Sequence, residues 1–209
     1  MLEKLACNLV RNDELPNIEL AEELCRNDDS SGIAEIVGGL TDGTAEIAND
    51  CIKVLYEIGA RKPQLISAYV DVFISSLSSR NNRIVWGAMT ALATIAEETP
   101  ATIFENLDAL IAAYHKGSVI TVDNAVRVFA KLAKVSPVYE KTLLPILLNH
   151  LSNCRAKELP QHAESSAICF NKANASSFIE IIKKRYTEFT VPQQRRIDKI
   201  LKQLTGLKS

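Results

Sequence analysis

The chain has 209 residues, 47% hydrophobic and 23% charged, which is the composition of an ordinary soluble folded protein. Its formal net charge of -1 at pH 7 provides no overall field that would favour nucleic acid or a membrane surface. Eight glycines and seven prolines are spread along the chain with no low-complexity linker. We therefore predict one continuous domain over residues 1–209.

The charged side chains are distributed unevenly. Residues 1–50 hold 3 basic against 12 acidic side chains, a net charge of minus nine, whereas residues 183–209 hold 8 basic against 2 acidic, a net charge of plus six. The sequence thus predicts an acidic end and a basic end. If repeats place these segments at opposite tips, a mostly monomeric protein with weak head-to-tail self-association at low salt is expected.

The five cysteines contain no CxxC pair, and their odd number favours a reducing compartment. The N-terminal stretch MLEKLACNLVRNDELP carries charges among its apolar residues, unlike a signal peptide. The longest apolar run, LLPILLNHL at 143–151, is too short to span a bilayer. These features predict a cytoplasmic protein.

A repeat with a period of 37 residues organises the chain. One column of the repeat holds prolines, namely Pro63, Pro100 and Pro137. Further columns hold apolar or small residues: Leu40, Leu77, Tyr114 and Leu151; Cys51, Ala88 and Ala125; Leu55, Leu92 and Phe129; Ile58, Ile95 and Leu132. A period of this length is typical of stacked repeat arrays.

In chain order, residues 1–30 are expected to form an incomplete leading repeat that acts as a cap, with LPNIELAEELCRN as its helix. Residues 31–189 hold the repeats, and residues 190–209 form a C-terminal capping helix. Apolar residues recur at spacings of three and four, so each repeat is predicted to be a pair of amphipathic helices. The fold class is therefore all-α, with about five to six helical hairpins stacked as a solenoid.

The repeat around residue 77 defines the hairpin best. Its first helix is predicted from about Pro63 to Ser78 and its second from about Arg83 to Glu98. The prolines are expected to open the first helices, where a missing N–H costs nothing. Gly38 and Gly39 fall near a helix end, where they end or loosen the helix.

The repeat resembles the HEAT/armadillo superfamily, as a divergent member. The matching features are the leucine column, Asp42 two places after Leu40, an apolar residue at Ile47 or Ile84, and the small-residue column of Cys51. The resemblance implies a right-handed α-α superhelix (a HEAT-like solenoid) whose second helices line a concave face. The family often has Arg or Lys just after the apolar residue, and this sequence departs from it there. Those positions are Ala48, Val85 and Val122, so an apolar seam is expected to replace a polar ladder.

The sequence contains no catalytic constellation, and we predict that the protein is not an enzyme. His115, His150 and His162 each stand alone near a helix end without HExxH or a neighbouring cysteine, so they are interpreted as solvated or capping residues. Cys51 is interpreted as a packing residue. No catalytic residue, no metal ligand and no cofactor is predicted.

The candidate site is therefore the solvent-facing side of the second helices. The predicted partner-binding residues are Asn49, Lys53, Tyr56, Trp86, Thr90, Asp123 and Arg127. Trp86, the only tryptophan, either forms an exposed hot spot or packs sideways over the adjacent repeat. The basic C-terminal helix is either a solvated capping face or a site for an acidic partner or nucleic acid.

These features predict a non-enzymatic scaffold or adaptor that holds an unidentified protein or peptide on its concave face. The alternative is a nucleic-acid-binding helical repeat similar to the alkylpurine DNA glycosylases, which implies a basic groove with aromatic residues. Nucleic acid is not the expected partner, because Lys53 and Arg127 stand against Glu57 and Asp123 in the candidate groove. A membrane is not expected either, because the net charge is -1 and no apolar run is long enough to span a bilayer.

Overall fold

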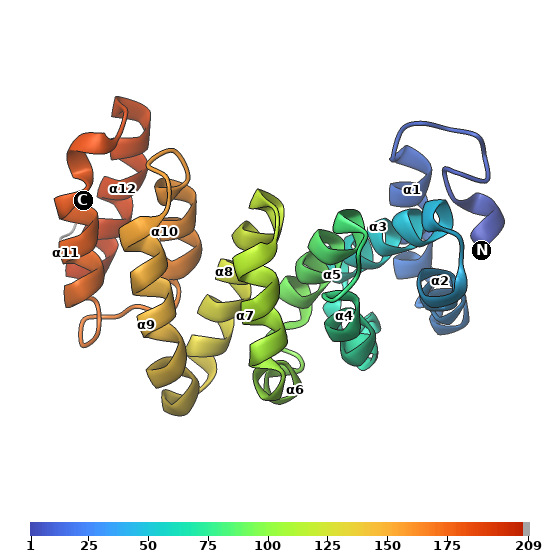
Figure 1. The fold of residues 1–209 in the computed structure, drawn as a ribbon, viewed down its shortest axis with the longest axis horizontal. Helices are drawn as coiled ribbons and strands as arrows, with labels where there is room; N and C mark the ends of the chain where they lie inside the picture. Colours follow the sequence, from blue (N-terminus) through green and yellow to red (C-terminus); the bar gives the residue numbers. More distant parts are fainter. Residues whose placement is uncertain (207–209) are drawn as a thin grey trace. The chain divides into compact units, whose positions relative to one another are not determined.

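The computed structural model describes residues 1–206, which form α-helices and short 3₁₀ helices and, within that range, no strand (Figure 1). The α-helices are α1 (Leu15–Asn27), α2 (Ser30–Asp42), α3 (Ala45–Arg61), α4 (Val70–Ser76), α5 (Asn82–Ile95), α6 (Pro100–Glu105), α7 (Leu107–Lys116), α8 (Val119–Val135), α9 (Pro137–Asn153), α10 (Leu159–Ala167), α11 (Ser176–Lys184) and α12 (Val191–Thr205). The 3₁₀ helices are Leu2–Lys4, Pro63–Leu65, Ser67–Tyr69 and Tyr186–Glu188. None of the described helices is both long and apolar enough to cross a membrane.

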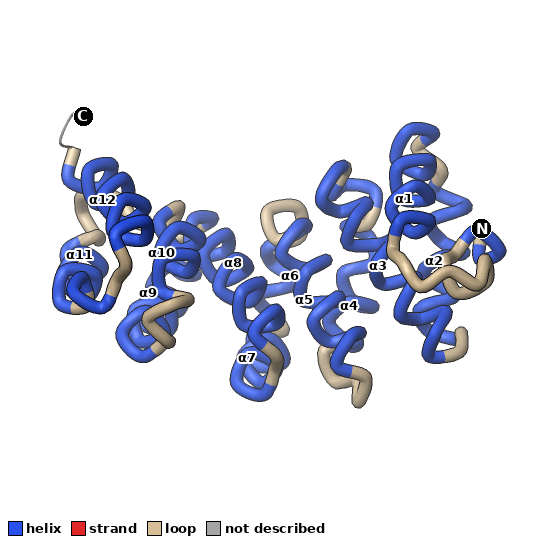
Figure 2. The backbone as a smooth tube through the Cα atoms, turned by 90° about the horizontal axis from the view of Figure 1, so that it is seen from above, coloured by secondary structure: helices blue, strands red, loops and turns tan. Residues whose placement is uncertain are grey.

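The chain divides into two compact units, Met1–Ala125 and the residues from Val126 onward, with the boundary inside α8. In the first unit α3 lies between α1 and α5, while α2 packs on α3 and α4 packs on α5. In the second unit α9 packs on α11 and α10 packs on α12 (Figure 2). Each unit thus has two layers of helices. The single continuous domain over 1–209 stays a prediction.

Polar caps and prolines set the helix starts. The side chain of Asp29 accepts a hydrogen bond from Gly32 N at 2.8 Å to open α2, and that of Asn81 accepts one from Arg83 N at 3.0 Å to open α5. These bonds satisfy backbone donors that have no partner within the helix. The expected role of the prolines is confirmed, because Pro63, Pro100 and Pro137 each stand at the first position of a helix.

The columns of the repeat form the core. Leu55, Leu92 and Phe129 are each 0% exposed, as are the members of the small-residue column, Cys51, Ala88 and Ala125. Helices of the same register therefore bury their apolar faces against one another, as expected of a stacked array. The packing role predicted for Cys51 is confirmed.

Glycines mark where helices approach most closely. A Cβ atom on Gly87 of α5 would lie 2.6 Å from Ile52 Cγ1 of α3. A Cβ atom on Gly39 of α2 would lie 2.7 Å from Cys51 Sγ of α3. Gly39 therefore permits the close packing of α2 on α3. Because α2 continues to Asp42, the interpretation that Gly38 and Gly39 end the helix is wrong, while a loosening effect stays a prediction.

Two predicted first helices are interrupted. Between Pro63 and Ser78 only Val70–Ser76 is α-helical, and it follows two 3₁₀ turns around Ile66. The first helix of the next repeat breaks at Asn106, between α6 and α7. The φ and ψ angles of Asn106 are -104° and 22°, and its side-chain Nδ2 donates to Thr102 O at 2.9 Å. The hydrophobic period predicts which face points inward. It does not reveal such local breaks, because 3₁₀ turns also form backbone hydrogen bonds and can place the same residues inward.

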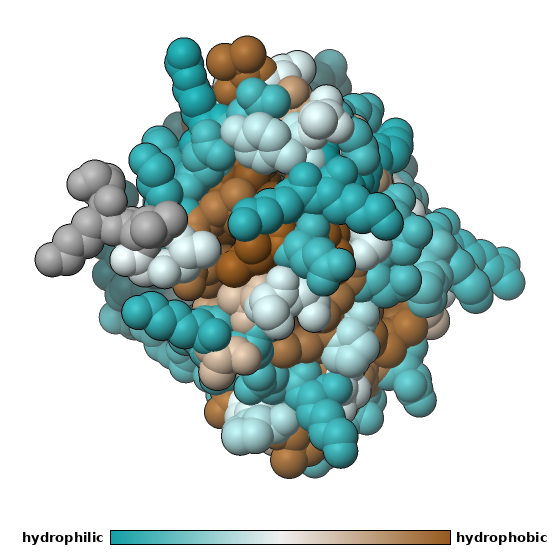
Figure 3. Space-filling model, turned by 90° about the vertical axis from the view of Figure 1, so that its left-hand side faces the viewer, coloured by the Kyte–Doolittle hydropathy of each residue, from teal (hydrophilic) through white to brown (hydrophobic). Residues whose placement is uncertain are grey.

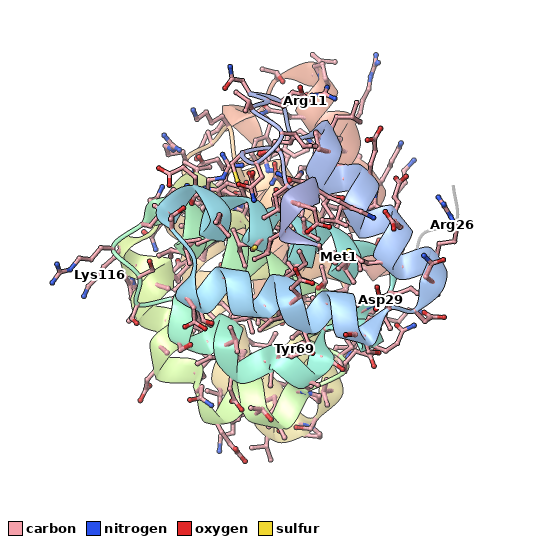
Figure 4. All side chains as sticks on the ribbon, turned by 90° about the vertical axis from the view of Figure 1, so that its right-hand side faces the viewer. Met1, Arg11, Arg26, Asp29, Tyr69 and Lys116 are labelled. Carbon is pink, nitrogen blue, oxygen red and sulfur yellow. The ribbon has the colours of Figure 1, made fainter. Side chains whose placement is uncertain are left out.

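The N-terminal segment is held against α1 and α3 by hydrogen bonds from its backbone N–H groups to side chains. Ala6 N donates to Asn17 Oδ1 at 3.0 Å, and Cys7 N donates to Asp50 Oδ2 at 2.8 Å. Figure 4 shows Met1 beside α2, which begins after Asp29. Leu5 and Ala6 of this segment are buried, although its role as a cap stays a prediction.

At the other end, α12 buries an apolar stripe of Ile197, Ile200 and Leu204. Its exposed side carries basic residues, including Arg195 and Lys199. Figure 3 shows apolar side chains gathered in a hollow at this end, surrounded by hydrophilic ones. The capping role of residues 190–209 stays a prediction, and residues 207–209 lie outside the described range.

Candidate functional site

The predicted site residues lie on three helices: Asn49, Lys53 and Tyr56 on α3, Trp86 and Thr90 on α5, and Asp123 and Arg127 on α8. Direct packing of α3 on α5 brings the first two groups together in the first unit. Asp123 is half-buried at the end of that unit. Arg127 is exposed and belongs to the second unit.

Tyr56 and Trp86 form an aromatic pair between neighbouring repeats. Their ring centroids are 5.8 Å apart with an interplanar angle of 49°. Both side chains are half-buried. Trp86 therefore packs sideways over the adjacent repeat, one of the two alternatives left open by the sequence, while part of its ring remains accessible. Such tilted pairs contribute about 0.5–1.5 kcal/mol beyond their buried area.

Lys53 differs from its prediction as a solvent-facing residue. Its side chain is 9% exposed, and its Nζ atom lies 2.8 Å from Glu57 Oε1 and 3.1 Å from Glu14 Oε2. The Nζ atom also lies 4.8 Å from the centroid of the Tyr56 ring. Burial lowers the pKa of Lys53, but hydrogen bonds to Glu57, Tyr56 and Glu14 raise it more, so the net pKa shift is upward. The prediction that Lys53 faces solvent is therefore wrong, while its part in partner binding stays a prediction.

Lys53 is the centre of a chain of alternating charges across three helices. Glu14, at the start of α1, pairs through its second oxygen with Arg83 Nη2 at 2.6 Å. On the other side, Glu57 pairs with Arg61, and Arg61 pairs with Glu22 of α1 at 3.0 Å. We call these six residues the ion network: Arg83, Glu14, Lys53, Glu57, Arg61 and Glu22. Sequence reasoning missed it because its members come from three separate repeats.

Side-chain amides connect the second helices. Asn81 Nδ2 donates to Asn49 Oδ1 at 2.8 Å, and Asn124 Nδ2 donates to Thr90 Oγ1 at 2.9 Å. Thr90 Oγ1 in turn donates to Trp86 O at 2.7 Å. The predicted residues Asn49 and Thr90 thus hold the helices in register.

Of the three positions expected to form an apolar seam in place of the family's polar ladder, Ala48 and Val85 are buried, whereas Val122 is only half-buried. However, Asn81 and Asn124 supply a polar ladder of their own beside it. The signal that could have revealed Asn124 is its place in the repeat. It lies 37 residues after Gly87, a position that faces the preceding helix.

A separate groove of about 620 Å³ lies in the first unit away from these residues. Its lining includes Ile74 and Leu77, Val85 of α5, and Ala113 of α7. Lys116, labelled in Figure 4, also contributes to it. None of the seven predicted site residues lines this groove.

Two histidines contradict their interpretation as solvated or capping residues without a cysteine nearby. His150 is 7% exposed and His162 is 1% exposed, and the His150 Nε2 and His162 Nδ1 atoms are 2.8 Å apart. Cys154 lies beside them, and the three ligand atoms are all within 4.8 Å of one another. Only His115 is exposed, as predicted. The sequence signal was H-x₃-C-x₇-H, a spacing that places two ligand types on one helix end and the third on the next helix.

No family model matches the sequence, and no curated protein is significantly similar to it. Solved structures are similar in fold. An engineered protein from a structural-genomics programme is 19% identical with a TM-score of 0.67, and the match covers 98% of this chain and 96% of that one. A computationally designed armadillo repeat protein for modular peptide recognition is 16% identical with a TM-score of 0.66, covering 90% and 91%.

A designed armadillo repeat protein in complex with the peptide (KR)4 is 15% identical with a TM-score of 0.70, covering 89% of both chains. Identities this low establish the fold alone. The predicted all-α solenoid of helical hairpins and the resemblance to armadillo-type repeats are thereby confirmed. This chain has the fold of an armadillo-like helical-repeat protein with a divergent sequence.

Proposed function

We propose that the protein is a non-enzymatic scaffold that binds an extended peptide or protein segment along α3 and α5, centred on Tyr56 and Trp86. The observation that carries this proposal is the half-exposed aromatic pair shared by two adjacent repeats. Aromatic side chains on rigid helices lose little entropy on binding and are enriched among interaction hot spots. Next to the pair, the ion network and the hydrogen bond from Asn81 to Asn49 connect α3 and α5.

The charge of the first unit favours a basic segment. Residues 1–125 hold 9 basic against 19 acidic side chains, a net charge of -10, whereas residues 126–209 hold 15 against 6, a net charge of +9. A Lys/Arg-rich segment is therefore attracted to the first unit. That two similar structures are designed armadillo proteins, one described for peptide recognition and one in complex with (KR)4, supports this assignment.

The nucleic-acid alternative receives less support. Affinity for phosphate backbones depends on accessible cations. Lys53, one of the two cations among the predicted site residues, is buried against Glu14 and Glu57. Duplex DNA binding at moderate salt that falls steeply with added salt and depends on Arg127 would reverse this ranking.

The direct test uses labelled extended peptides of equal length, one rich in Lys and Arg and one rich in Glu and Asp, each with one central Leu. Fluorescence anisotropy should show binding of the basic peptide. Trp86→Ala should weaken it by at least about 30-fold, the loss of about 2 kcal/mol expected of a hot spot. The matched control is Tyr69→Ala, which removes a half-buried aromatic ring from a 3₁₀ helix in the same unit.

Circular dichroism of both variants establishes that the helices remain folded. Equal affinity of Trp86→Ala and the unaltered protein for the basic peptide would refute the binding face. The natural partner is then sought by affinity capture and mass spectrometry, with the double variant Trp86→Ala and Arg127→Ala as the negative bait. A partner retained by the double variant binds elsewhere on the molecule.

A further inference from the structure

The cluster of His150, Cys154 and His162 lies within the second unit, where α9 turns into α10. His150 is in the last turn of α9, and Cys154 is the residue that ends this helix, its N–H bonded to His150 O at 2.8 Å. His162 is in the first half of α10. The connection between the two helices therefore brings two imidazole rings and one thiol to a single point.

We propose that His150, Cys154 and His162 bind a zinc-class divalent transition metal ion. Two imidazole nitrogens and a thiolate are ligands that zinc prefers, with Zn–N of about 2.0–2.1 Å and Zn–S of about 2.3 Å. In a tetrahedral site with these bond lengths, ligand atoms lie about 3.3–3.8 Å apart. The three atoms of the cluster already lie within 4.8 Å of one another.

Only small side-chain movements are needed to reach that geometry. The His150 Nε2 and His162 Nδ1 atoms face each other at 2.8 Å. A metal ion would replace the shared hydrogen, and the two nitrogens would separate by about half an ångström to reach tetrahedral spacing. The two ring nitrogens that face each other are therefore the ones that would bind.

The surroundings suit a site with three protein ligands. Cys154 is half-buried while both histidines are buried, so the thiol is the most accessible ligand and lies on the side from which an ion would enter. Arg185 Nη1 donates to Leu151 O at 2.9 Å and lies 3.9 Å from Cys154 Sγ, so a positive charge stands beside the thiol. The fourth coordination position is left to water or to an outside ligand.

Such an ion would connect α9 to α10 across residues 154–158. Because it binds the folded form, it should raise the unfolding temperature of the protein as its concentration rises. The metal site lies in the second unit and the proposed peptide-binding face in the first, so either can be refuted without the other.

The test titrates chelator-treated protein with Co²⁺, which reports its own coordination. We expect one ion per chain, a thiolate-to-cobalt charge-transfer band in the near ultraviolet, visible bands of tetrahedral intensity, and loss of all of them when Zn²⁺ is added. Cys154→Ser should remove the charge-transfer band, and His162→Gln should weaken Co²⁺ binding by at least about tenfold through loss of a ligand.

The matched controls are Cys7→Ser, another half-buried thiol, and His115→Gln, an exposed imidazole; both should leave the titration unchanged. Because His162 is buried, the result for His162→Gln is used only if circular dichroism shows native helix content. If it does not, the result for Cys154→Ser decides. Absence of the charge-transfer band in the unaltered protein, or its persistence in Cys154→Ser, would overturn the proposal and leave a hydrogen-bonded histidine pair.

Discussion

Replacing Gly87 by alanine tests whether α3 and α5 are as closely packed as the candidate face requires. The new Cβ atom would lie 2.6 Å from Ile52 Cγ1 and 3.1 Å from Ile52 Cγ2. Ordinary carbon contacts are about 3.5–4.0 Å. Ile52 is 0% exposed, and both atoms are attached directly to its Cβ atom, so the side chain has no flexible end that could move away. The helices must shift instead.

The magnitude follows from two opposing effects. Overpacking of this kind costs about 1–3 kcal/mol. Replacement of glycine by alanine within a helix recovers about 0.5–1 kcal/mol. The net expectation for Gly87→Ala is a destabilisation of about 0–2.5 kcal/mol. Gly38→Ala is the matched control, because a Cβ atom there meets nothing within 4 Å and the same gain in helix propensity should appear alone.

Urea unfolding measures both variants. Trp86 is the only tryptophan, so its fluorescence reports the first unit, and circular dichroism reports all helices. With a slope of about 1–3 kcal/mol per molar urea, Gly87→Ala should unfold at lower urea than the unaltered protein and Gly38→Ala at higher urea. If Gly87→Ala is stabilised as much as Gly38→Ala, the close approach of the two helices does not exist.

Three further outcomes are expected. Arg185→Ala should destabilise the second unit by about 1–3 kcal/mol, because it leaves Leu151 O without its donor, whereas Arg195→Ala, at an exposed position, should be neutral in thermal unfolding. Lowering the pH from about 5 to about 3 should destabilise the protein. Burial raises the pKa of Glu57, but its hydrogen bonds to Lys53 and Arg61 together lower it more, so the net folded pKa lies below the ordinary value and the stabilisation is lost as pH falls through that folded pKa. Glu57→Gln should reduce this dependence in acid titrations. Sedimentation velocity should show mass rising with concentration at low salt and a monomer at physiological salt, where charges are screened within about 8 Å, and a salt-independent dimer would indicate an apolar contact instead.

The sequence predicted the stacked array of helical hairpins but not the interruptions within two of the first helices. The period of 37 identified the buried columns, since Leu55, Leu92 and Phe129 must all face the same core. It also identified α3 and α5 as carriers of the candidate site. It did not predict the break at Asn106, because helical and 3₁₀ turns place the same residues inward.

The polar contacts were harder to predict than the core. Apolar burial follows from each residue's own helix, whereas a salt bridge depends on which helix lies opposite. Glu14 and Lys53 are separated by a complete hairpin in sequence, yet their charged atoms are 3.1 Å apart. The same limit applies to His150 and His162, which are on different helices and meet only because the α9–α10 turn reverses the chain.

The ion network and the aromatic pair have different consequences for partner choice. The pair between Arg61 and Glu22 at the surface contributes about 0–1 kcal/mol. The pairs of the buried Lys53 mainly offset the cost of removing its charge from water, so the network orients α1, α3 and α5 more than it stabilises them. Because its cations and carboxylates neutralise one another, the surface next to Trp86 carries little charge of its own. Preference for a basic segment must then come from the net charge of -10 on the whole first unit, which acts at longer range. Long-range attraction is screened by salt, whereas apolar contact with Trp86 is not. The proposed mode of binding therefore requires that added salt reduce the preference for basic over acidic peptides while the loss caused by Trp86→Ala remains.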